Sequence, residues 1–255
     1  MTSLLNPFSL EGKKILITGA SSGIGKQCAI DFSRMGATVI MIARNENRLK
    51  QTFSELSGEG HIIISADLTN FNAIPELVES IANSTGKIDG LVNCAGISTT
   101  LPLKLISVEK LDEFFRTNVY STIELTRHVT KAKYMNSGAS VIFFSSVMGC
   151  VGESGKSLYS MTKGALISAT RSLACEFAKR QIRVNCVSPG AILTPINENL
   201  PHMADPELRK RLEEKHLLGL GKTSDISYAC IYLLSDAARW VTGHNLVVDG
   251  GYTAR

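Results

Sequence analysis

A tyrosine, a lysine and a serine in the second half of the chain have the types and the spacing for proton transfer to an oxygen atom. Tyr159 and Lys163 form Tyr-x-x-x-Lys within a segment of helical pattern, so they lie one turn apart on the same face. A phenol has a pKa of about 10, but a nearby ammonium lowers that pKa, each unit being worth about 1.36 kcal/mol. The pair therefore predicts that Tyr159 is a general acid for a carbonyl oxygen, although a solvated helix face would explain the same spacing.

The serine stands where a parallel strand is expected to end. Ser146 closes the run Phe143-Phe144-Ser145-Ser146, thirteen residues before Tyr159. Open α/β sheets place their ligands at the carboxyl ends of strands, and a hydroxyl there can orient a carbonyl and stabilise its developing negative charge. Ser145 competes for this role, but side chains alternate between the faces of a strand, so only one of the two serines points towards the site.

A glycine-rich segment near the amino terminus has the pattern of a phosphate-binding turn. The apolar run 14–18 passes into Gly-Ala-Ser-Ser-Gly-Ile-Gly at residues 19–25, and a helical pattern begins at once. Glycines permit the tight turn and remove the Cβ that would block a pyrophosphate, while the following helix points free N–H groups at the anion. The spacing is G-x-x-x-G-x-G rather than the more widespread G-x-G-x-x-G. The residues predicted to hold the dinucleotide here are Gly19, Ser21, Ser22, Gly23, Ile24 and Gly25.

The end of the second apolar run indicates which nicotinamide cofactor is bound. An acidic residue at this position bonds the adenosine ribose 2′-hydroxyl and repels a 2′-phosphate. The run ends here in Ile42-Ala43-Arg44-Asn45, without a carboxylate. Because Arg44 can form charge-assisted bonds to phosphate, NADP(H) is favoured over NAD(H). An ordinary solvated arginine is the alternative, and Ser22, where a second basic residue might have stood, offers only a hydroxyl.

Two later turns are also predicted to meet the cofactor. Asp67 and Leu68 follow the third run, and the Asp67 carboxylate can accept a hydrogen bond from the adenine amino group or cap the next helix. The Asn-Cys-Ala-Gly turn after the fourth run lets the backbone approach the cofactor ribose, a structural turn being the alternative. The residues predicted to make the ribose contact are Asn93, Ala95 and Gly96.

The elements that would carry these groups alternate along the chain. Apolar, β-rich runs are separated by segments with apolar residues at helical spacing, such as 24–35 and 74–82. Such alternation predicts a parallel sheet with helices on both faces. The runs are 14–18, 38–43, 61–66, 90–93, 141–145, 183–187 and 245–248. We therefore expect an α/β fold: a single-domain, Rossmann-type, doubly wound parallel sheet of about seven strands with helices on both faces.

One domain is expected to span residues 1–255 and to bind NADP(H). No linker rich in proline, glycine or serine and no internal repeat divides the chain. Residues 193–220 fit the alternation least, because they are polar, contain proline and have no strand pattern. They are expected to form a helical excursion over the edge of the sheet, either a lid over the substrate or a surface insertion.

The composition argues against several classes of protein. Of 255 residues, 44% are hydrophobic and 20% are charged, as in soluble globular proteins, and the net charge of +4 comes from scattered Lys and Arg. Nucleic-acid binding is therefore not expected. Without a targeting segment or an apolar run of about 18 residues, the protein is expected to be cytoplasmic and free of membrane contact. Six cysteines lie far apart with no C-x-x-C pair, so no metal site is expected.

Taken together, the motifs resemble those of the short-chain dehydrogenase/reductase family over essentially the whole chain. TGASSGIG, NCAG and the Thr-Asn-Val of 117–119 are followed by the SS before YSMTK. Ser-Pro-Gly at 188–190 and Val-Asp-Gly-Gly at 248–251 complete the family order. The joint match is far more specific than any one of these motifs alone.

The resemblance implies a role for each residue of the site. Ser146 would bind the substrate carbonyl, since its spacing to the tyrosine fits the family better than that of Ser145. Tyr159 would be the acid/base, Lys163 would tune it and bond the nicotinamide ribose, and Asn118 would hold a water in a proton relay. The residues implied to lie in the segment that bonds the nicotinamide carboxamide are Pro189, Gly190, Ile192 and Thr194.

Within the family, the chain is most similar to 3-oxoacyl-[acyl-carrier-protein] reductases. That similarity implies reduction of a carbonyl to a secondary alcohol with NADPH, and acyl carrier protein as a partner. Such a reductase needs a basic surface, because its partner is strongly acidic. Arg180 matches one docking position, whereas the other falls near Asn136 and Ser137, where no charge stands; Lys131 and Lys133 lie close by.

Other readings of function stay open. Family members also act on sugars, polyols, steroids and small ketones, and fold and cofactor motifs do not distinguish these substrates. A sensor that binds NADPH without catalysis should have lost part of the Asn-Ser-Tyr-Lys tetrad, yet all four positions are filled. The resemblance also implies a homotetramer, and the helix predicted at 157–180 carries apolar residues on more than one face.

Overall fold

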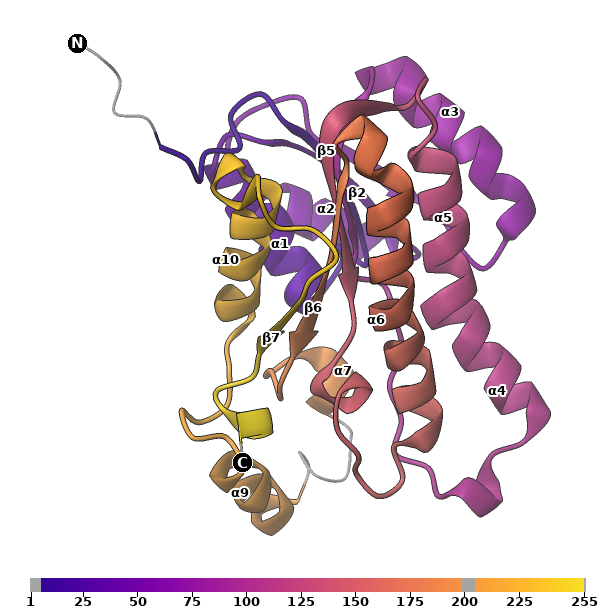
Figure 1. Cartoon of the computed structure of the whole chain (residues 1–255), viewed down its shortest axis with the longest axis vertical. Helices are drawn as coiled ribbons and strands as arrows, with labels where there is room; N and C mark the ends of the chain where they lie inside the picture. Colours follow the sequence, from indigo (N-terminus) through magenta and orange to yellow (C-terminus); the bar gives the residue numbers. More distant parts are fainter. Residues whose placement is uncertain (1–5, 199–204, 255) are drawn as a thin grey trace.

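Strands from distant parts of the chain pair in the order β3-β2-β1-β4-β5-β6-β7, all of them parallel. This sheet is seen in a computed structural model, which describes residues 6–198 and 205–254 (Figure 1). Its strands are β1 (Lys14–Thr18), β2 (Thr38–Ala43), β3 (Ile62–Ser65), β4 (Ile88–Asn93), β5 (Met135–Phe144), β6 (Arg183–Pro189) and β7 (Asn245–Val248). The predicted doubly wound parallel sheet is confirmed.

Burial on both faces explains why the strands could be recognised. In β1, the consecutive residues Ile15, Leu16 and Ile17 have no exposed surface, as expected for a strand covered by helices on either side. The largest difference from the expected bounds is in β5, which begins at Met135 rather than at residue 141. Its first residue pairs with Ile88, and the register then shifts before Gly90, so this early part lacks the continuous apolar pattern.

Helices form a layer on each face of the sheet (Figure 1). The helices of the described residues are α1 (Gly23–Arg34), α2 (Glu46–Phe53), α3 (Ile74–Thr85), α4 (Val108–Phe115), α5 (Ser121–Val129), α6 (Ser157–Phe177), α7 (Pro195–Glu198), α9 (Pro206–Glu214) and α10 (Thr223–Leu234). α1 and α10 pack against one face around Phe32, and α3, α5 and α6 pack against the other around Phe143. None of the helices described is long and apolar enough to cross a membrane.

The sheet has a reversal point at β1, which lies between β2 and β4. The chain runs from β1 to β3 at one edge and then returns to β4 on the other side of β1. Ligands of open α/β sheets bind in the crevice that such a reversal leaves at the carboxyl ends of the strands. The turns after β1 and β4 meet in this crevice, where the N–H of Ala95 donates to Oγ1 of Thr18 at 3.0 Å. The fold therefore places the two predicted cofactor turns side by side.

The described part of the segment 193–220 includes two helices. It contains α7 and α9, and residues 199–204 within it lie outside the described residues. Because it follows β6 directly, it lies beyond the carboxyl ends of the strands (Figure 1). The N–H of Leu218 donates to the carbonyl of Gly250 at 3.0 Å, which fastens the segment to the turn after β7. The excursion therefore stands at the same end of the sheet as the crevice.

Replacement of Gly25 tests how closely α1 is seated on the first turn. A Cβ at this position would lie 2.4 Å from the carbonyl oxygen of Gly19, so the main chain would have to shift. We expect Gly25→Ala to lower the free energy of unfolding in urea by about 1–3 kcal/mol. The matched control is Gly152→Ala, because no described atom lies within 4 Å of its Cβ position, and it should stay within about 0.5 kcal/mol of the wild type. Equal free energies of unfolding for the two variants would contradict the close contact between Gly25 and the carbonyl of Gly19.

Candidate active site

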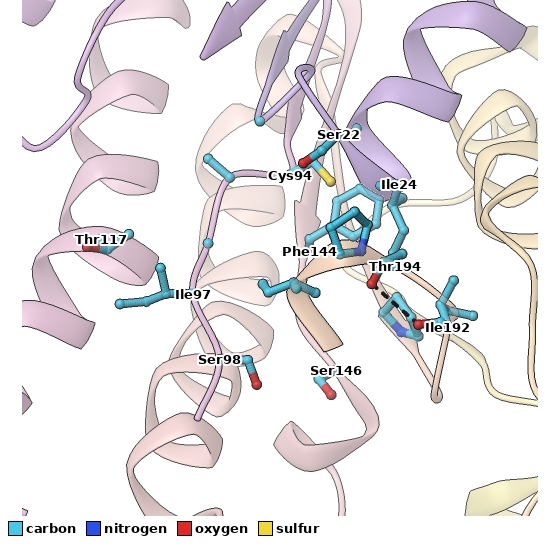
Figure 2. A pocket seen from close by; sticks show the side chains of 18 of the residues that line it. Ser22, Ile24, Cys94, Ile97, Ser98, Thr117, Phe144, Ser146, Ile192 and Thr194 are labelled. Atoms are coloured by element: carbon cyan, nitrogen blue, oxygen red, sulfur yellow. Dashed lines mark hydrogen bonds between the residues drawn. The ribbon is translucent and has the colours of Figure 1, made fainter. Parts of the chain in front are cut away.

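A cavity of about 710 Å³ opens at the carboxyl ends of the strands (Figure 2). This is the size of sites that enclose a cofactor or a substrate. Most of the predicted residues line it: Gly19, Ser21, Ser22, Gly23, Ile24, Gly25, Arg44, Asn45, Asp67, Leu68, Ala95, Gly96, Ser146, Tyr159, Lys163, Pro189, Gly190, Ile192 and Thr194. Two predicted residues, Asn93 and Asn118, are not among those that line it. The fold thus brings together groups from nearly the whole chain.

The glycine turn forms one end of the cavity and leaves helix N–H groups free. Gly19 and Gly23 have φ values of +70° and +54°, which glycine adopts without strain. Ser22 is the N-cap of α1, but its side chain makes no capping bond, so the N–H groups of the first helical turn stay available for an anion. Thr194, whose Oγ1 donates to the carbonyl of Ile192 at 3.4 Å, lies over this turn (Figure 2). The arrangement fits a pyrophosphate.

Two guanidinium groups line the cavity at the end of β2. Arg44 was predicted there, and Arg48, in the first half of α2, was missed. Asn45 caps α2 because its Oδ1 accepts from the N–H of Arg48 at 3.0 Å. Arg48 stands four residues after Arg44 at the start of a helix, and this spacing was the signal that could have identified it. The lining residues from the end of β2 to α2 bring two positive charges and no carboxylate.

Asp67 lines the cavity near these arginines without capping a helix. Its Oδ1 accepts from the N–H and the Oγ1 of Thr69, at 2.9 and 2.8 Å. These bonds, chiefly the one from the main chain, hold the pKa of Asp67 below its usual value. The alternative of a helix cap is wrong, because α3 begins only at Ile74, with Ala73 as its N-cap. The carboxylate is therefore held ionised at the cavity wall.

The two asparagines predicted for the site are buried beside the cavity. The Asn93 amide donates to Oγ1 of Thr126 at 3.2 Å and so faces α5. The Asn118 amide accepts from the N–H of Ile97 at 2.8 Å and donates to the carbonyl of Ile97 at 3.0 Å and to Oγ1 of Thr162 at 3.1 Å. Both amide N–H groups of Asn118 are thereby used. Its side chain connects the chain after β4 to α6, and its part in holding a relay water stays a prediction.

Ser146 and Tyr159 meet at the middle of the cavity. The Ser146 hydroxyl lies near enough to the phenol to lower the pKa of Tyr159, but desolvation has the larger effect and raises that pKa to about 12. Oγ of Ser146 also accepts from the N–H of Met148 at 3.2 Å. The competing Ser145 directs its hydroxyl to the carbonyl of Lys163, at 2.8 Å. Ser146 is thus the serine that the structure joins to the tyrosine.

Lys163 is buried on α6 and is not bonded to the tyrosine hydroxyl. Its Nζ donates to the carbonyl of Phe144 at 2.8 Å and lies 5.6 Å from the centroid of the Tyr159 ring. Burial lowers the pKa of Lys163 to about 8. The prediction that this ammonium lowers the Tyr159 pKa is wrong for the protein alone, because desolvation of the phenol dominates.

Sequence reasoning missed the side chains that line the cavity beyond Tyr159. They are Ser98, Met148, Glu153, Lys156, Leu212, His216 and Tyr252. Lys156 had a signal, since a residue three positions before Tyr159 shares its helix face. His216 and Tyr252 had none, because their rings, with centroids 4.8 Å apart, come from turns that only the finished fold brings together. These residues form the wall against which a substrate would lie.

The arrangement can move a proton at one defined point. A half-buried phenol beside a serine hydroxyl can give a proton to an oxygen atom placed between them or take one from it. The same serine hydroxyl can stabilise negative charge on that oxygen. The glycine turn and the two arginines form the opposite end of the cavity, where phosphate groups would be held.

Comparison with known proteins gives matches over nearly the whole chain. A family model described as enoyl-(acyl carrier protein) reductase matches residues 19–253. The chain is 34% identical over 247 residues to a 3-oxoacyl-[acyl-carrier-protein] reductase of Thermotoga maritima, covering 95% of this chain and 98% of that protein. It is 35% identical over 246 residues to a cyclopentanol dehydrogenase of Comamonas, covering 95% of this chain and 97% of that protein.

Solved structures show the same fold. A candidate NAD(P)-dependent gluconate 5-dehydrogenase from Beutenbergia cavernae, with bound NADP at low occupancy, superimposes with a TM-score of 0.90 at 30% identity. The match covers 98% of this chain and 100% of that one. A short-chain dehydrogenase/reductase from Serratia marcescens gives a TM-score of 0.89 at 28% identity, covering 97% and 100% of the two chains.

Lys163→Met tests the burial of the ammonium through the pH dependence of stability. The folded chain releases the Lys163 proton near pH 8, whereas an unfolded chain keeps it to a pH of about 10.4. Between these values the unfolded state binds more protons, so the contribution of Lys163 to the free energy of unfolding rises with pH. We expect the wild type to gain stability relative to Lys163→Met as the pH is raised from about 8 to about 10, measured by urea unfolding. If the free energies of unfolding of the two proteins changed with pH in the same way, the burial of the Lys163 ammonium would be contradicted.

Proposed function

The chain belongs to the short-chain dehydrogenase/reductase family of oxidoreductases, and from this premise we propose that it interconverts a carbonyl group and a secondary alcohol with NADP(H). The observation that carries the proposal is that Tyr159 and Ser146 line one cavity, with the serine hydroxyl near enough to the phenol to affect its pKa. Both residues line the same cavity as the glycine turn, so a substrate oxygen at the pair and a dinucleotide in the turn share one space.

The residues present fit a dinucleotide. Gly25 keeps the main chain of the turn open where a Cβ would collide, and the uncapped start of α1 offers N–H groups to the pyrophosphate. Arg44 and Arg48 would hold the 2′-phosphate that distinguishes NADP(H) from NAD(H), since the end of β2 brings no carboxylate to repel it. Lys163, one turn beyond Tyr159, would bond the nicotinamide ribose.

The chemistry assigned to the chain's own residues is proton transfer. The bound cofactor supplies or accepts the hydride. In the direction of reduction, Ser146 holds the carbonyl oxygen, and Tyr159 gives its hydroxyl proton to that oxygen as negative charge develops there. Tyr159 is left as a phenolate, which the Ser146 hydroxyl stabilises. Asn118 contributes by fixing the chain at Ile97 and α6 relative to each other.

The segment 193–220 is proposed to act as a lid. Nζ of Lys215, at the end of α9, lies 3.0 Å from a carboxylate oxygen of Glu153, in the loop before α6. His216 and Leu212 of the same segment line the cavity. Opening of the segment would break this ion pair and uncover the substrate end of the cavity.

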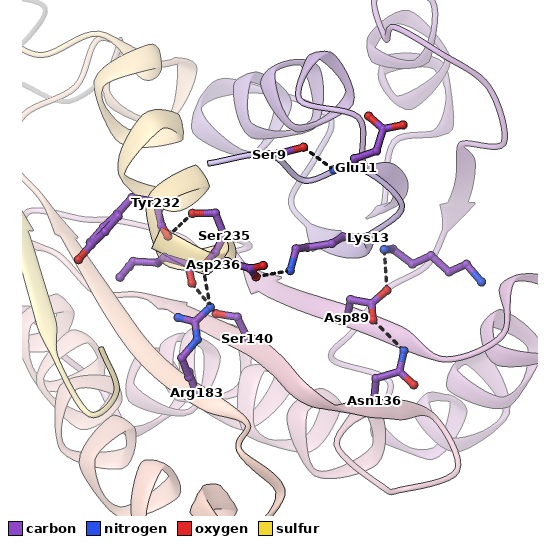
Figure 3. A network of polar contacts seen from close by, with 12 residues as sticks. Ser9, Glu11, Lys13, Asp89, Asn136, Ser140, Arg183, Tyr232, Ser235 and Asp236 are labelled. Carbon is purple, nitrogen blue, oxygen red and sulfur yellow. Dashed lines mark hydrogen bonds and ion pairs between the residues drawn. The ribbon is translucent and has the colours of Figure 1, made fainter. Parts of the chain in front are cut away.

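The surface predicted to bind acyl carrier protein includes Arg180 and the region of Asn136. Reduction of a 3-oxoacyl group on acyl carrier protein was the first expectation, yet Arg180 donates to the main-chain carbonyls of Thr130 and Met135 and is thereby held within the fold. Asn136 donates to Asp89 at 2.7 Å, near the amino ends of the strands and away from the cavity (Figure 3). The basic docking surface therefore gains no support from Arg180, and small ketones, sugars, polyols and steroids are kept as substrate classes.

The homotetramer implied by the family is retained as a proposal. Tyr120 at the start of α5 and Met161 on α6 expose 48% and 46% of their surface, on the helical layer that would pair with a second copy. Exposed apolar side chains on packed helices are typical of surfaces that associate. Light scattering would give the number of subunits.

Tyr159→Phe tests the proton transfer. The change removes the hydroxyl and leaves the ring, so NADPH should bind as in the wild type, while carbonyl reduction should fall by about 10²- to 10⁴-fold. Turnover is measured by NADPH absorbance and cofactor binding by fluorescence titration. Tyr134→Phe is the matched control, because Tyr134 is buried but does not line the cavity, and it should keep its turnover. Substantial reduction by Tyr159→Phe would overturn the mechanism.

Arg44→Ala tests the choice of cofactor. Loss of a charge-assisted bond to the 2′-phosphate should raise the KM for NADPH by about 10- to 100-fold and leave the KM for NADH within about threefold. Lys50→Ala is the control, because this exposed lysine of α2 pairs with Glu46 and does not line the cavity. A wild-type enzyme that prefers NADH, or an Arg44→Ala variant that loses both cofactors equally, would contradict the assignment.

A further inference from the structure

The substrate end of the cavity contains a buried ammonium that the proton transfer does not use. Lys156 is 7% exposed, caps the start of α6 and lines the cavity. It is the residue directly before α6 and stands three positions before Tyr159, and both side chains line the same cavity. Any substrate whose oxygen is bonded to Tyr159 would therefore lie close to this charge.

The Lys156 ammonium is hydrogen-bonded to a neutral group and forms no ion pair of its own among the described residues. Its Nζ donates to the carbonyl of Thr99 at 3.2 Å, a neutral acceptor. Glu153 is the nearest carboxylate to affect it, but the Glu153 carboxylate is bonded to Lys215 at 3.0 Å, and both groups reach solvent, with 32% and 49% of their side chains exposed. Burial outweighs Glu153 and lowers the pKa of Lys156.

The other polar residues that line this end bring no second negative charge. The Asp249 carboxylate interacts with His216 but does not line the cavity, and it accepts from the N–H groups of Gly251 and Thr253. His216 accepts from the N–H of Ala191 at 3.1 Å through Nε2, and its Nδ1 lies 2.8 Å from the carbonyl of Leu212, which a proton on Nδ1 satisfies. This is the neutral tautomer, with both ring nitrogens engaged. Tyr252 is an uncharged phenol, whose pKa burial raises. Among the residues that line this end, Lys156 brings an ammonium and Glu153 a carboxylate, and the carboxylate is already paired with Lys215.

Such a site favours an anion. An ammonium taken out of water needs an oppositely charged or multiply bonded partner, and one main-chain carbonyl replaces only part of its lost hydration. A substrate carboxylate would restore that partner through a short, charge-assisted bond. A phosphate would call for more donors than one ammonium supplies, so a group with a single negative charge fits better.

We propose that Lys156 binds a carboxylate of the substrate, so that the enzyme acts on a small oxo acid and the corresponding hydroxy acid. A small substrate can reach both groups, because Lys156 and Tyr159 line the same cavity and are three residues apart in the chain. This inference rests on the proposed function, since Tyr159 marks where the carbonyl is held. It makes Lys156 the residue that determines specificity, whereas Tyr159 and Ser146 act on any carbonyl compound.

The experiment compares acids with their neutral esters. NADPH-dependent reduction is measured for 2-oxobutanoate, 3-oxobutanoate and 4-oxopentanoate and for the methyl ester of each, with the wild type, Lys156→Met and Lys156→Arg. We expect the wild type to favour at least one acid over its ester. Lys156→Met should lower kcat/KM for that acid by about 10²-fold, mainly through KM, and change the value for the ester by less than about threefold. Lys156→Arg should restore part of the preference, and the exposed Lys110→Met, outside the cavity, should change neither value.

Two results would overturn the inference while leaving the proposed function intact. One is a wild-type enzyme that reduces the esters and rejects all three acids. The other is an equal loss for acid and ester in Lys156→Met, which is what a lysine that only holds Thr99 in place would give. If no carbonyl compound is reduced at all, the proposed function fails. Calorimetric titration with butanoate then decides separately on Lys156: binding to the wild type but not to Lys156→Met supports the carboxylate site, and equal or absent binding refutes it.

Discussion

Main-chain contact between the turn after β1 and the turn after β4 sets the geometry on which the rest of the site depends. A Cβ on Gly19 would lie 3.0 Å from the main chain of Ala95, so the two turns are packed without room for a side chain. β5 pairs with β4, and its end is therefore held against the same crevice. Ser146 follows that end directly, and α6 returns over it to bring Tyr159 into contact. The glycine turn and the pair of Ser146 and Tyr159 thus line one continuous cavity.

Much of this arrangement could be predicted, because the residues that build it follow local rules. Strands such as β1 are buried on both faces and read as unbroken apolar runs, and Gly19 and Gly23 mark a turn that other residues would strain. Strand alternation restricted the site to one of two serines, and spacing favoured Ser146. What connects these positions is topology: parallel strands bring all their carboxyl ends to one edge, so residues far apart in sequence are expected together.

The parts that could not be predicted depend on tertiary packing. Asn118 stands at a family position, and its amide is hydrogen-bonded to Ile97 and Thr162. No local sequence pattern indicates these two partners. The sign of the Tyr159 pKa shift was expected to follow Lys163, whereas it is decided by how completely the phenol is buried. His216 could not be predicted as a site residue for a related reason. It lies in the segment 193–220, which has no periodic pattern, and its ring packs against Tyr252 near the end of the chain.

Because the start of α1 has no side-chain cap, a dinucleotide bound there would raise the free energy of unfolding. Ser22 leaves the first N–H groups of the helix without a side-chain acceptor, and a phosphate that accepts them takes over the function of a cap. A ligand that binds only the native chain shifts the unfolding equilibrium by mass action, by RT ln(1 + [L]/Kd). The lifetime of this enzyme in a cell would then follow the local dinucleotide pool, so that a fall in cofactor supply would leave more of the chain open to proteases.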